Sequence, residues 1–590
     1  MISSALTTPV SIKTGFLILL AALVSTRVSW SAEQLTRSDV EKIVAQAATK
    51  AAEIDPNAII AVTDRDGFLL AVWDVKGRLP NPLVSFPAPP FPSLVSSTFK
   101  LYSLVGGAIT RASTAAFLSS DGEAFTSRTA GYIIQQHFPV GVRDTPNGPL
   151  VGVGLSSLFF TDVNRVKLIP PGFDGAAAFP APSPGNPNPA PLSPGIRAPL
   201  FVPTTLNDSP GGVPLYKNGH LVGGIGVTGD GSPTDLAPAG AIVFNQTQSK
   251  FTTGFKTSRD KDEDVALAGQ TGFRPSADII ATNVLIGGIR IPYVFDPVGN
   301  IRDLDNAHPL GDYGRPIDIF LPFGSPTIVS GRPQASPAAF PYEQASLGDV
   351  PGEIRFPIID DPLKQVAGRE LVGKKAARLT ADEVRSILSK AAHQAGMTRA
   401  GIRLPLGVPS QNFIAVVNNP EKAGEAPAIL GVYRTGEATI FSWDVAVQKA
   451  RTSVFFSNSQ LAMSSRTVGF MSQRYFPPGI DGFPAGPFFG FQEAVSLKRS
   501  PKGKPNPQSF PGNSNLPNGI TIFPGGFPLY RHGQLIGAIG VSGDGIDQDD
   551  LIATAGTVDF IAPTAIRADH FIYHGTRLPY AKFPRDPDIH

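Results

Sequence analysis

The sequence predicts an α+β protein made of two repeated domains, each a small antiparallel β-sheet packed with helices. The first observation is a near-verbatim repeat: Gly211–Gly231 reads GGVPLYKNGHLVGGIGVTGDG, and Gly525–Gly545 reads GGFPLYRHGQLIGAIGVSGDG. The second is that apolar residues recur at helical spacing after Thr36 and again after Thr380. A strand pattern and a helix pattern that are both repeated favour a tandem duplication.

Each near-verbatim stretch consists of two short apolar runs around a tight polar turn. The turns are Lys217–Gly219 and Arg531–Gly533. Because their glycine tolerates positive φ, each stretch is predicted to form a β-hairpin. The glycines along the second strand of each hairpin predict a close neighbour on that strand.

Each repeat begins with a predicted helix. Thr36 and Thr380 stand at the expected N-caps, and an acid follows each three residues later, Asp39 and Glu383. This spacing is that of a capping box. The apolar stripe of each helix is expected to lie on a sheet. The strands that follow are expected at residues 58–62 and 68–73, and at 413–417 and 429–433.

A further long segment is shared by both repeats. Arg111–Pro139 keeps one constant register against Lys449–Pro477, which predicts one rigid element. Both copies carry Ser-Arg-Thr-x-Gly, at 127–131 and 465–469. A Gln-x-x-Phe-Pro motif then predicts the end of a helix, because proline cannot continue one.

Composition and length fit two globular modules with long irregular connections. The 590 residues are 42% hydrophobic and 17% charged, with 61 Gly and 58 Pro. The formal net charge of +2 is spread along the chain, so nothing indicates a nucleic-acid partner. We expect a signal peptide at 1–31, a first domain with Pro-rich insertions at 32–296, a linker at 297–374 and a second domain at 375–590.

The N-terminus predicts export. Lys13 precedes an apolar run at 15–24, and the small residues Ser29 and Ser31 suit cleavage before Ala32. A periplasmic or secreted bacterial protein is therefore expected, with an uncleaved anchor as the alternative. No later segment approaches the roughly 20 apolar residues of a membrane span, so no stable membrane insertion is expected after cleavage. The absence of cysteine excludes disulfides, thiolate metal sites and covalent Cys-x-x-Cys-His haem attachment.

The hairpin signature, the Gln548–Asp550 segment that follows it and the upstream segments Gln448–Thr452 and Arg111–Thr114 together resemble the GlcG/HbpS family of haem-binding proteins. The resemblance covers about two thirds of the chain in two pieces. It implies an exported protein that binds or handles haem or a related tetrapyrrole without covalent attachment. It also implies oligomers with the ligand at subunit contacts, and some family members are credited with haem degradation.

Five residues are candidates for haem contact under this resemblance. Histidine is a natural axial ligand of iron, and none of the eight histidines recurs at a matching position in both repeats. His393 lies on the opening helix of the second repeat, and His137 lies opposite Tyr475, itself a possible iron ligand. Arg128 and Arg466 suit a haem propionate or, equally, an internal carboxylate. For each histidine the alternative is a satisfied surface side chain, as expected for His220 and His532.

Other functions are less well supported by the sequence. Gly224-x-Gly226-x-x-Gly229 fits a dinucleotide fingerprint, but its strand enters from an antiparallel hairpin rather than a parallel βαβ unit. Acids after the glycines suggest either a cation site or charges at the start of the closing helix: Asp230, Asp544, Asp547, Asp549 and Asp550.

No nucleophile set or paired carboxylates stand out, so a binding protein is expected rather than an enzyme, and no catalytic residue is assigned. The rival hypothesis is a non-haem structural or interaction module in which the two copies form an internal pseudo-dimer. An enzyme acting on small organic acids is a third possibility.

Overall fold

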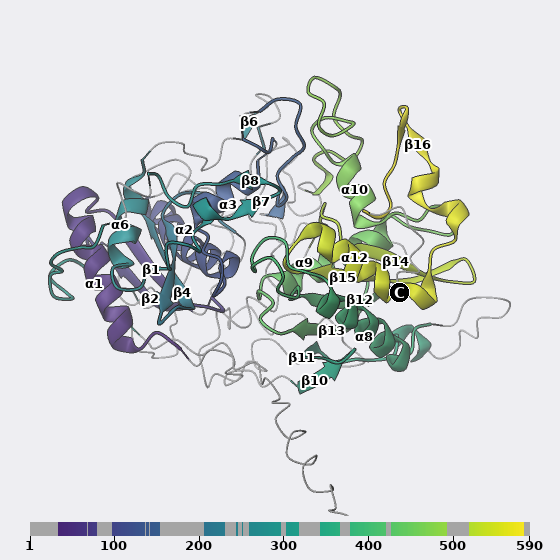
Figure 1. Cartoon of the computed structure of the whole chain (residues 1–590), viewed down its shortest axis with the longest axis horizontal. Helices are drawn as coiled ribbons and strands as arrows, with labels where there is room; N and C mark the ends of the chain where they lie inside the picture. The colour runs from purple at the N-terminus through teal and green to yellow at the C-terminus, as the bar shows by residue number, and fades with distance from the viewer. Residues whose placement is uncertain are drawn as a thin grey trace, which may run out of the picture.

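The computed structural model describes residues 33–67, 69–78, 97–135, 137–140, 142–153, 206–229, 244–245, 250–251, 259–296, 302–317, 328, 343–365, 378–420, 426–492 and 519–582. The predicted signal peptide, Asp230 and the Pro-rich stretch at 79–92 lie outside these residues. Figure 1 shows two sheet-and-helix halves side by side, with the N-terminal half on the left. We call residues 33–317 the first half and 343–582 the second half.

The first half is built on a five-stranded antiparallel sheet with the order β3-β4-β1-β2-β9. The strands are β1 (Ile59–Asp64), β2 (Leu69–Asp74), β3 (Gly212–Lys217), β4 (His220–Thr228) and β9 (Arg315–Pro316). The helices are α1 (Arg37–Ile54), α2 (Ser97–Leu118), α3 (Ser127–Ile133) and α6 (Lys261–Gly269).

Two layers of helix cover the two faces of this sheet. On β4, a Cβ on Gly226 would lie 2.0 Å from the Ala108 carbonyl of α2, whereas the neighbouring Ile225 meets Gly269 of α6. Successive residues of a strand face opposite sides. Helix α2 therefore covers one face, and α6 with its partner α1 covers the other.

The second half repeats this arrangement on a six-stranded antiparallel sheet with the order β10-β11-β13-β12-β15-β14. The strands are β10 (Glu343–Leu347), β11 (Val350–Phe356), β12 (Phe413–Asn418), β13 (Ile429–Thr435), β14 (Gly526–Arg531) and β15 (Gln534–Ser542). The helices are α8 (Ala381–Met397), α9 (Ser442–Phe455), α10 (Ser465–Met471) and α12 (Ile546–Gly556).

Short elements complete both halves. They are the hairpins β5–β6 (Phe244–Asn245, Lys250–Phe251), β7–β8 (Leu285–Ile286, Ile289–Arg290) and β16–β17 (Ile572–Tyr573, Thr576–Arg577), and the 3-10 turns Ala281–Asn283, Pro362–Gln365, Val558–Phe560, Thr564–Ile566 and Ala568–His570. Among the described helices, none combines the length and apolar character needed to cross a bilayer.

The two sheets match strand for strand over four strands. The order β3-β4-β1-β2 has its counterpart in β14-β15-β12-β13. Register matches as well: Gly212 lies opposite Gly226, and Gly526 lies opposite Gly540. Both hairpins carry an irregularity at the same place, after Leu215 and after Leu529.

The local predictions of the sequence are confirmed. Thr36 and Thr380 cap α1 and α8 in complete capping boxes. The hairpin turns have positive φ at both central residues, 51° and 83° at 218–219 and 50° and 76° at 532–533, which matches the twist of the strands. The glycines of the second strand allow the backbone of a helix to approach closely, because a Cβ on Gly540 would lie 2.0 Å from the Ala446 carbonyl of α9.

One prediction of organisation needs correction, and the predicted linker contains strands. The segment Arg111–Pro139, predicted as one rigid element, is two helices, because α2 ends at Leu118 and α3 begins at Ser127. The region predicted as a linker contributes strands to both sheets: β9 pairs with β2, and β11 pairs with β13. A constant register between the two copies thus shows that corresponding residues are equally spaced in both, but it does not show that the segment is one unbroken helix.

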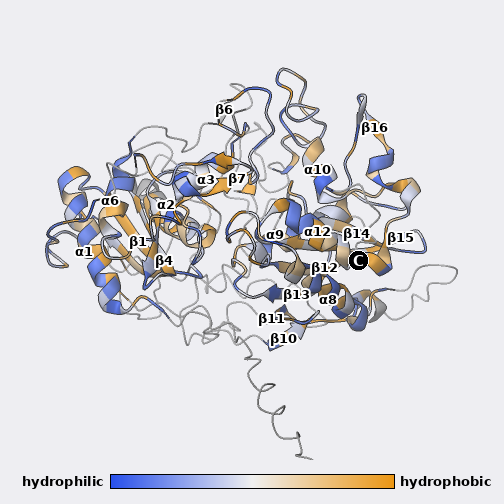
Figure 2. Cartoon of the chain, in the orientation of Figure 1, coloured by the Kyte–Doolittle hydropathy of each residue, from blue (hydrophilic) through white to orange (hydrophobic). Residues whose placement is uncertain are grey.

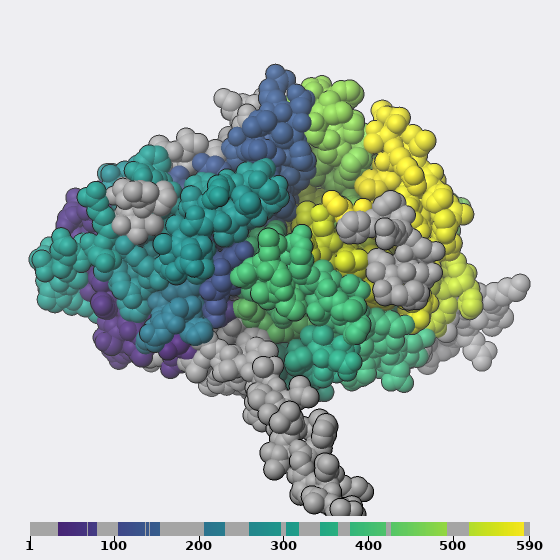
Figure 3. All heavy atoms as spheres, viewed as in Figure 1, coloured from purple at the N-terminus to yellow at the C-terminus, as the bar shows by residue number. Residues whose placement is uncertain are grey.

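The halves share a packed apolar contact. One cluster of buried apolar residues contains side chains of both halves, among them Phe117 and Phe441, whose ring centroids lie 6.0 Å apart. Figure 2 shows the apolar residues concentrated on the strands and the sheet-facing sides of the helices. In Figure 3 the surfaces of the two halves meet without a gap along the upper part of the molecule.

Candidate functional site

The structure brings together two of the predicted ligand residues from different halves. The rings of His137 and Tyr475 stack with centroids 6.3 Å apart and planes inclined by 19°. Each residue precedes a Phe-Pro pair in the loop after α3 or α10. They occupy corresponding positions of the two repeats, so this contact is made between equivalent residues of the two halves.

Matching backbone hydrogen bonds hold the two loops in one shape. Gly148 N donates to Gln135 O at 2.8 Å, and Gly486 N donates to Gln473 O at 2.9 Å. Both glycines are required, because a Cβ would lie 2.2 Å from Ile133 O in the first loop and 2.1 Å from Met471 O in the second. The same fold of both loops presents His137 and Tyr475 to one another.

Charged groups surround the stacked rings. His137 Nε2 lies 3.6 Å from Asp481 Oδ2, and Arg143 Nε lies 3.4 Å from the same oxygen. The guanidinium of Arg474 lies over the Tyr475 ring, 4.8 Å from its centroid. His137 Nδ1 is buried and has no hydrogen-bond partner among the described residues. We call His137, Arg143, Arg474, Tyr475 and Asp481 the junction site.

The chemistry of the junction site fits a tetrapyrrole that carries iron and acidic side groups. An imidazole nitrogen without a partner and a phenol are both ligands that haem iron accepts. Arg143, with a side chain that is 79% exposed, and Arg474 supply the positive charge that a propionate needs. His137 and Tyr475 would hold the iron, and the arginines would hold the propionates.

His393 lies apart from the junction site. It is on α8, where its exposed side chain lies against the turn between β10 and β11, with Nδ1 3.3 Å from Gly348 O. The backbone of the turn approaches α8 so closely that a Cβ on Gly348 would lie 2.7 Å from His393 N. The role of His393 as an iron ligand stays a prediction. The structure does not bring it together with His137 and Tyr475.

Arg128 and Arg466 are satisfied by carboxylates of their own halves. Arg128 forms a two-pronged contact with Glu263, with Nε–Oε1 of 2.7 Å and Nη2–Oε2 of 3.0 Å, and both side chains are buried. Arg466 donates to Asp550 at 2.8 Å and to Asp547 at 2.7 Å. Of the two roles open from the sequence, this geometry favours the internal carboxylate; contact with a propionate stays a prediction.

A second pair of buried cations was not predicted from the sequence. Lys449 Nζ donates to Asp549 Oδ2 and to Val541 O, both at 2.7 Å. At the corresponding place, Arg111 donates to Asp262 Oδ2 at 2.6 Å and to Val227 O. Burial lowers the pKa of Lys449 and raises that of Asp549, while their ion pair opposes both shifts. Each pair ties α2 or α9 to the adjacent strand and to the closing helix.

The signal for these ion pairs was present in the sequence. Tandem acids begin both closing helices, Asp262-Glu263 and Asp549-Asp550, and each copy has two cations at matching positions of its preceding helices. In the first copy Arg111 takes Asp262 and Arg128 takes Glu263. Each repeat thus has two acids on its closing helix and two cations on its preceding apolar helices. This equal number at matching positions would have predicted buried ion pairs.

The predicted role of the acids as helix-start charges is only partly right. Asp547 and Asp549 do lie in the first turn of α12. Helix α12, however, has Gly545 at its N-cap, without a side-chain bond. Asp544 instead accepts from Arg403 Nε at 2.9 Å and from Gln411 N at 2.7 Å. The described residues contain no cluster of three or more acids and histidines that could hold a metal ion.

The shared Ser-Arg-Thr motif has a structural role. Ser127 Oγ accepts from Gly212 N at 2.8 Å, as Ser465 Oγ does from Gly526 N. Thr129 and Thr467 donate to the carbonyls of Pro292 and Pro579, at 2.9 and 2.6 Å. These residues join the short helix to the signature hairpin and to the closing Arg-x-Pro-Tyr segment.

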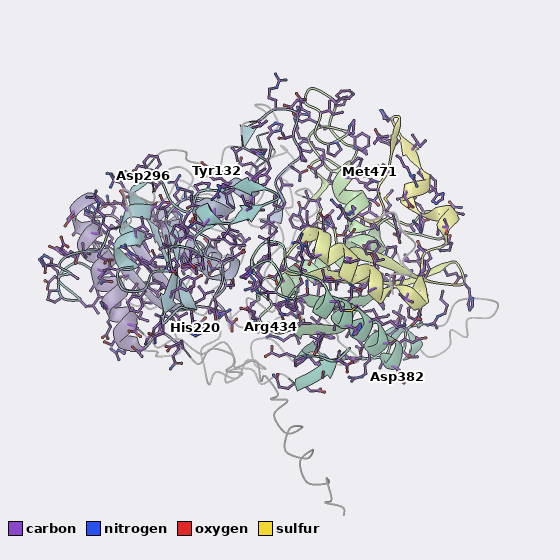
Figure 4. All side chains as sticks on the ribbon, viewed as in Figure 1. Tyr132, His220, Asp296, Asp382, Arg434 and Met471 are labelled. Atoms are coloured by element: carbon purple, nitrogen blue, oxygen red, sulfur yellow. The ribbon has the colours of Figure 1, made fainter. Side chains whose placement is uncertain are left out.

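A cluster of charges, here called the junction charges, connects the halves below the junction site. Arg65 of the first half pairs with Glu437 of the second and, at 3.0 Å, with Asp121. Arg403 of the second half donates to Ser119 O of the first at 3.3 Å. Figure 4 shows Arg434 on the side of the second half that faces the first; its guanidinium lies 3.4 Å from Asp66.

One acid of the first half lies beside these charges without a direct partner. Glu123 is 8% exposed, and its Oε2 has no hydrogen-bond partner among the described residues. Burial, followed by the field of Asp544, raises the pKa of Glu123 to about 7, although Arg403 opposes the shift. His220 is a satisfied surface side chain, as expected, because it is 43% exposed and its Nδ1 lies 2.8 Å from Asp121.

Comparison with known proteins identifies the region that carries the signature. Residues 414–557 match the family model described as haem degrading protein HbpS-like. The matched region runs from β12 to the end of α12. No curated protein matches the chain.

Three solved structures resemble part of the fold. They are a PduOC:heme complex (18% identity, TM-score 0.22, 32% of this chain and 99% of that chain), Klebsiella pneumoniae protein ORFY (19%, 0.21, 32% and 96%) and HbpS (18%, 0.20, 33% and 98%). Each spans about a third of this chain.

Proposed function

We propose that this protein is an exported haem-binding or haem-handling protein made of two HbpS-like domains that form an internal pseudo-dimer. The observation that carries the haem proposal is the match of residues 414–557 to a family of haem-degrading proteins. The expected signal peptide supports export. The equal strand order and register of the two sheets support the tandem duplication.

The pseudo-dimer proposal rests on contacts between corresponding positions. In a twofold interface, residues near the axis meet their own counterparts. His137 stacks on Tyr475, and Arg143 pairs with Asp481; each pair occupies matching positions of the two repeats. A duplicated chain can thereby satisfy internally a surface that single-domain relatives would use between subunits.

We place the ligand at the junction site, on His137 and Tyr475, with Arg143 and Arg474 as the nearest cations. This differs from a site built on Arg128 and Arg466, whose guanidinium groups already bind Glu263, Asp547 and Asp550. His393 is kept as the competing iron ligand. Because His137 and Tyr475 share one site, a single site per chain is expected.

Haemin titration, followed at the Soret band, tests this proposal. His137→Ala is expected to weaken haemin affinity at least tenfold, and Tyr475→Phe to shift the band or weaken binding. His532→Ala is the control, because His532 is exposed in a hairpin turn. A response to His393→Ala alone would move the site to α8, and a wild-type protein that does not bind haemin would remove the proposal.

The second candidate is a non-haem structural or interaction module with the same internal pseudo-dimer. It is favoured by one observation: all four cations shared by the repeats already bind internal carboxylates. In that case haemin would show no saturable Soret change, while the contact between the halves would persist.

A further inference from the structure

Exposed apolar side chains gather at one edge of the molecule. Of the eleven large apolar side chains that are most exposed in the described residues, five lie on three neighbouring turns, at 142–146, 479–485 and the β16–β17 hairpin. They are Val142 (47%), Ile480 (42%), Phe483 (48%), Phe571 (39%) and Ile572 (74%). Figures 1 and 3 show these three segments reaching the same upper edge. We call them the tip surface.

Direct contacts connect the three turns. Arg143 of the first turn lies 3.4 Å from Asp481 of the second. The second turn follows Phe476, whose ring lies 5.4 Å from that of Tyr573 in the β16–β17 hairpin. The three turns therefore lie next to one another at one edge of the molecule.

The exposure of apolar tips recurs in both halves. Val142 and Ile480 occupy corresponding positions of the repeats, and both are exposed. The counterpart of Ile572 is Leu285 of the β7–β8 hairpin, which is 53% exposed. That hairpin lies beside the first turn, because Gly287 is close to the ring of Phe138. Single exposed apolar residues are ordinary, but a set repeated at matching positions indicates a use.

Basic groups without acidic partners accompany the apolar tips. At the base of each hairpin an exposed arginine donates only to a backbone carbonyl of its own segment. Arg290 Nη1 bonds Thr282 O at 2.8 Å, and Arg577 Nε bonds Asp569 O at 2.6 Å. Neither forms an ion pair within the described part of the chain.

Two nearby acids are already engaged in ion pairs. Asp569 is paired with Arg567 and Asp481 with Arg143, whereas Asp144 keeps its negative charge and accepts a hydrogen bond from Asp481 N at 2.9 Å. The tip surface consequently presents apolar side chains next to available positive charge.

We propose that the tip surface binds the surface of an anionic lipid bilayer. Aliphatic and aromatic tips would enter the headgroup layer, and Arg290 and Arg577 would bind lipid phosphates. A second copy of the chain fits less well, because a symmetric contact would bring unpaired arginines of both copies together. The apolar side chains also project from separate turns rather than forming one flat face. This proposal does not depend on haem binding.

Vesicle co-sedimentation of the chain beginning at Ala32 tests the proposal. The probes are vesicles of phosphatidylcholine alone and of phosphatidylcholine with phosphatidylglycerol. We expect binding to the anionic vesicles that falls with salt. Arg290→Gln and Arg577→Gln should each weaken it about fivefold. Ile572→Asp should weaken it at least tenfold, because an apolar group of that size no longer leaves water.

Matched controls lie elsewhere on the surface. Arg385→Gln removes one exposed positive charge from α8, and Leu406→Asp changes a side chain that is 73% exposed outside the tip surface. Both should bind like the wild type. Equal binding to neutral and anionic vesicles, equal loss in the controls, or no binding at all would overturn the proposal. So would a wild-type dimer that Ile572→Asp converts to a monomer while vesicle binding is unchanged.

Discussion

Replacing Glu123 by glutamine should remove a pH dependence from the stability of the folded chain. Glu123 is buried beside Asp544 and Arg403, and its pKa of about 7 compares with 4.5 for an ordinary glutamate. Because the pKa of Glu123 is raised in the folded state, the contribution of its protonated form to the free energy of unfolding is fully present below pH 4.5. That contribution is lost as the pH rises through 7. The difference amounts to about 3 kcal/mol at most.

Urea unfolding at pH 5 and pH 8, followed by tryptophan fluorescence, measures this effect. Trp443, which is 7% exposed in α9, belongs to the apolar cluster that contains side chains of both halves. Glu123→Gln should be more stable than the wild type at pH 8 by up to about 3 kcal/mol, with the difference shrinking toward pH 5. Glu343→Gln, at an exposed position of β10, is the control. Equal pH dependence in the wild type and Glu123→Gln would refute the reasoning.

Three further predictions concern the scaffold. Lys449→Met should cost about 3–5 kcal/mol of unfolding free energy, because Asp549 loses its buried partner. Lys449→Arg should be tolerated, since an arginine, Arg111, occupies the matching place in the first half. Equal losses for the two variants in chemical denaturation would contradict this prediction. Gly540→Ala should abolish soluble expression or lower Tm strongly, because its Cβ would lie 2.0 Å from Ala446 O, whereas Gly533→Ala has open space and should suffer only the smaller strain of its positive φ. Separately expressed halves, cut between 329 and 342, should aggregate or dimerise through exposed apolar surface; two stable monomers in analytical ultracentrifugation would rule out an obligatory pseudo-dimer.

Features set by neighbouring residues could be predicted from the sequence. Capping boxes at Thr36 and Thr380 and the positive-φ turns at 218–219 and 532–533 depend on a few adjacent side chains. The glycines of β15 predicted a close neighbour, because glycine inside a strand often marks the place where another backbone approaches closely.

Features that depend on distant partners could not be predicted in the same way. Arg128 offers the same fork to a propionate as to Glu263, and only the fold places that acid within 2.7 Å. The stacking of His137 on Tyr475 joins residues of two halves, so their alignment in the repeats was visible but their contact was not.

The stoichiometry of haemin binding tests the central claim most directly. The junction site combines His137 of one half with Tyr475 of the other, so it exists once in each chain. Spectrophotometric titration of the chain beginning at Ala32 to its Soret end point should give one haemin per chain. Two equivalent haemins per chain, or no saturable binding, would contradict the account.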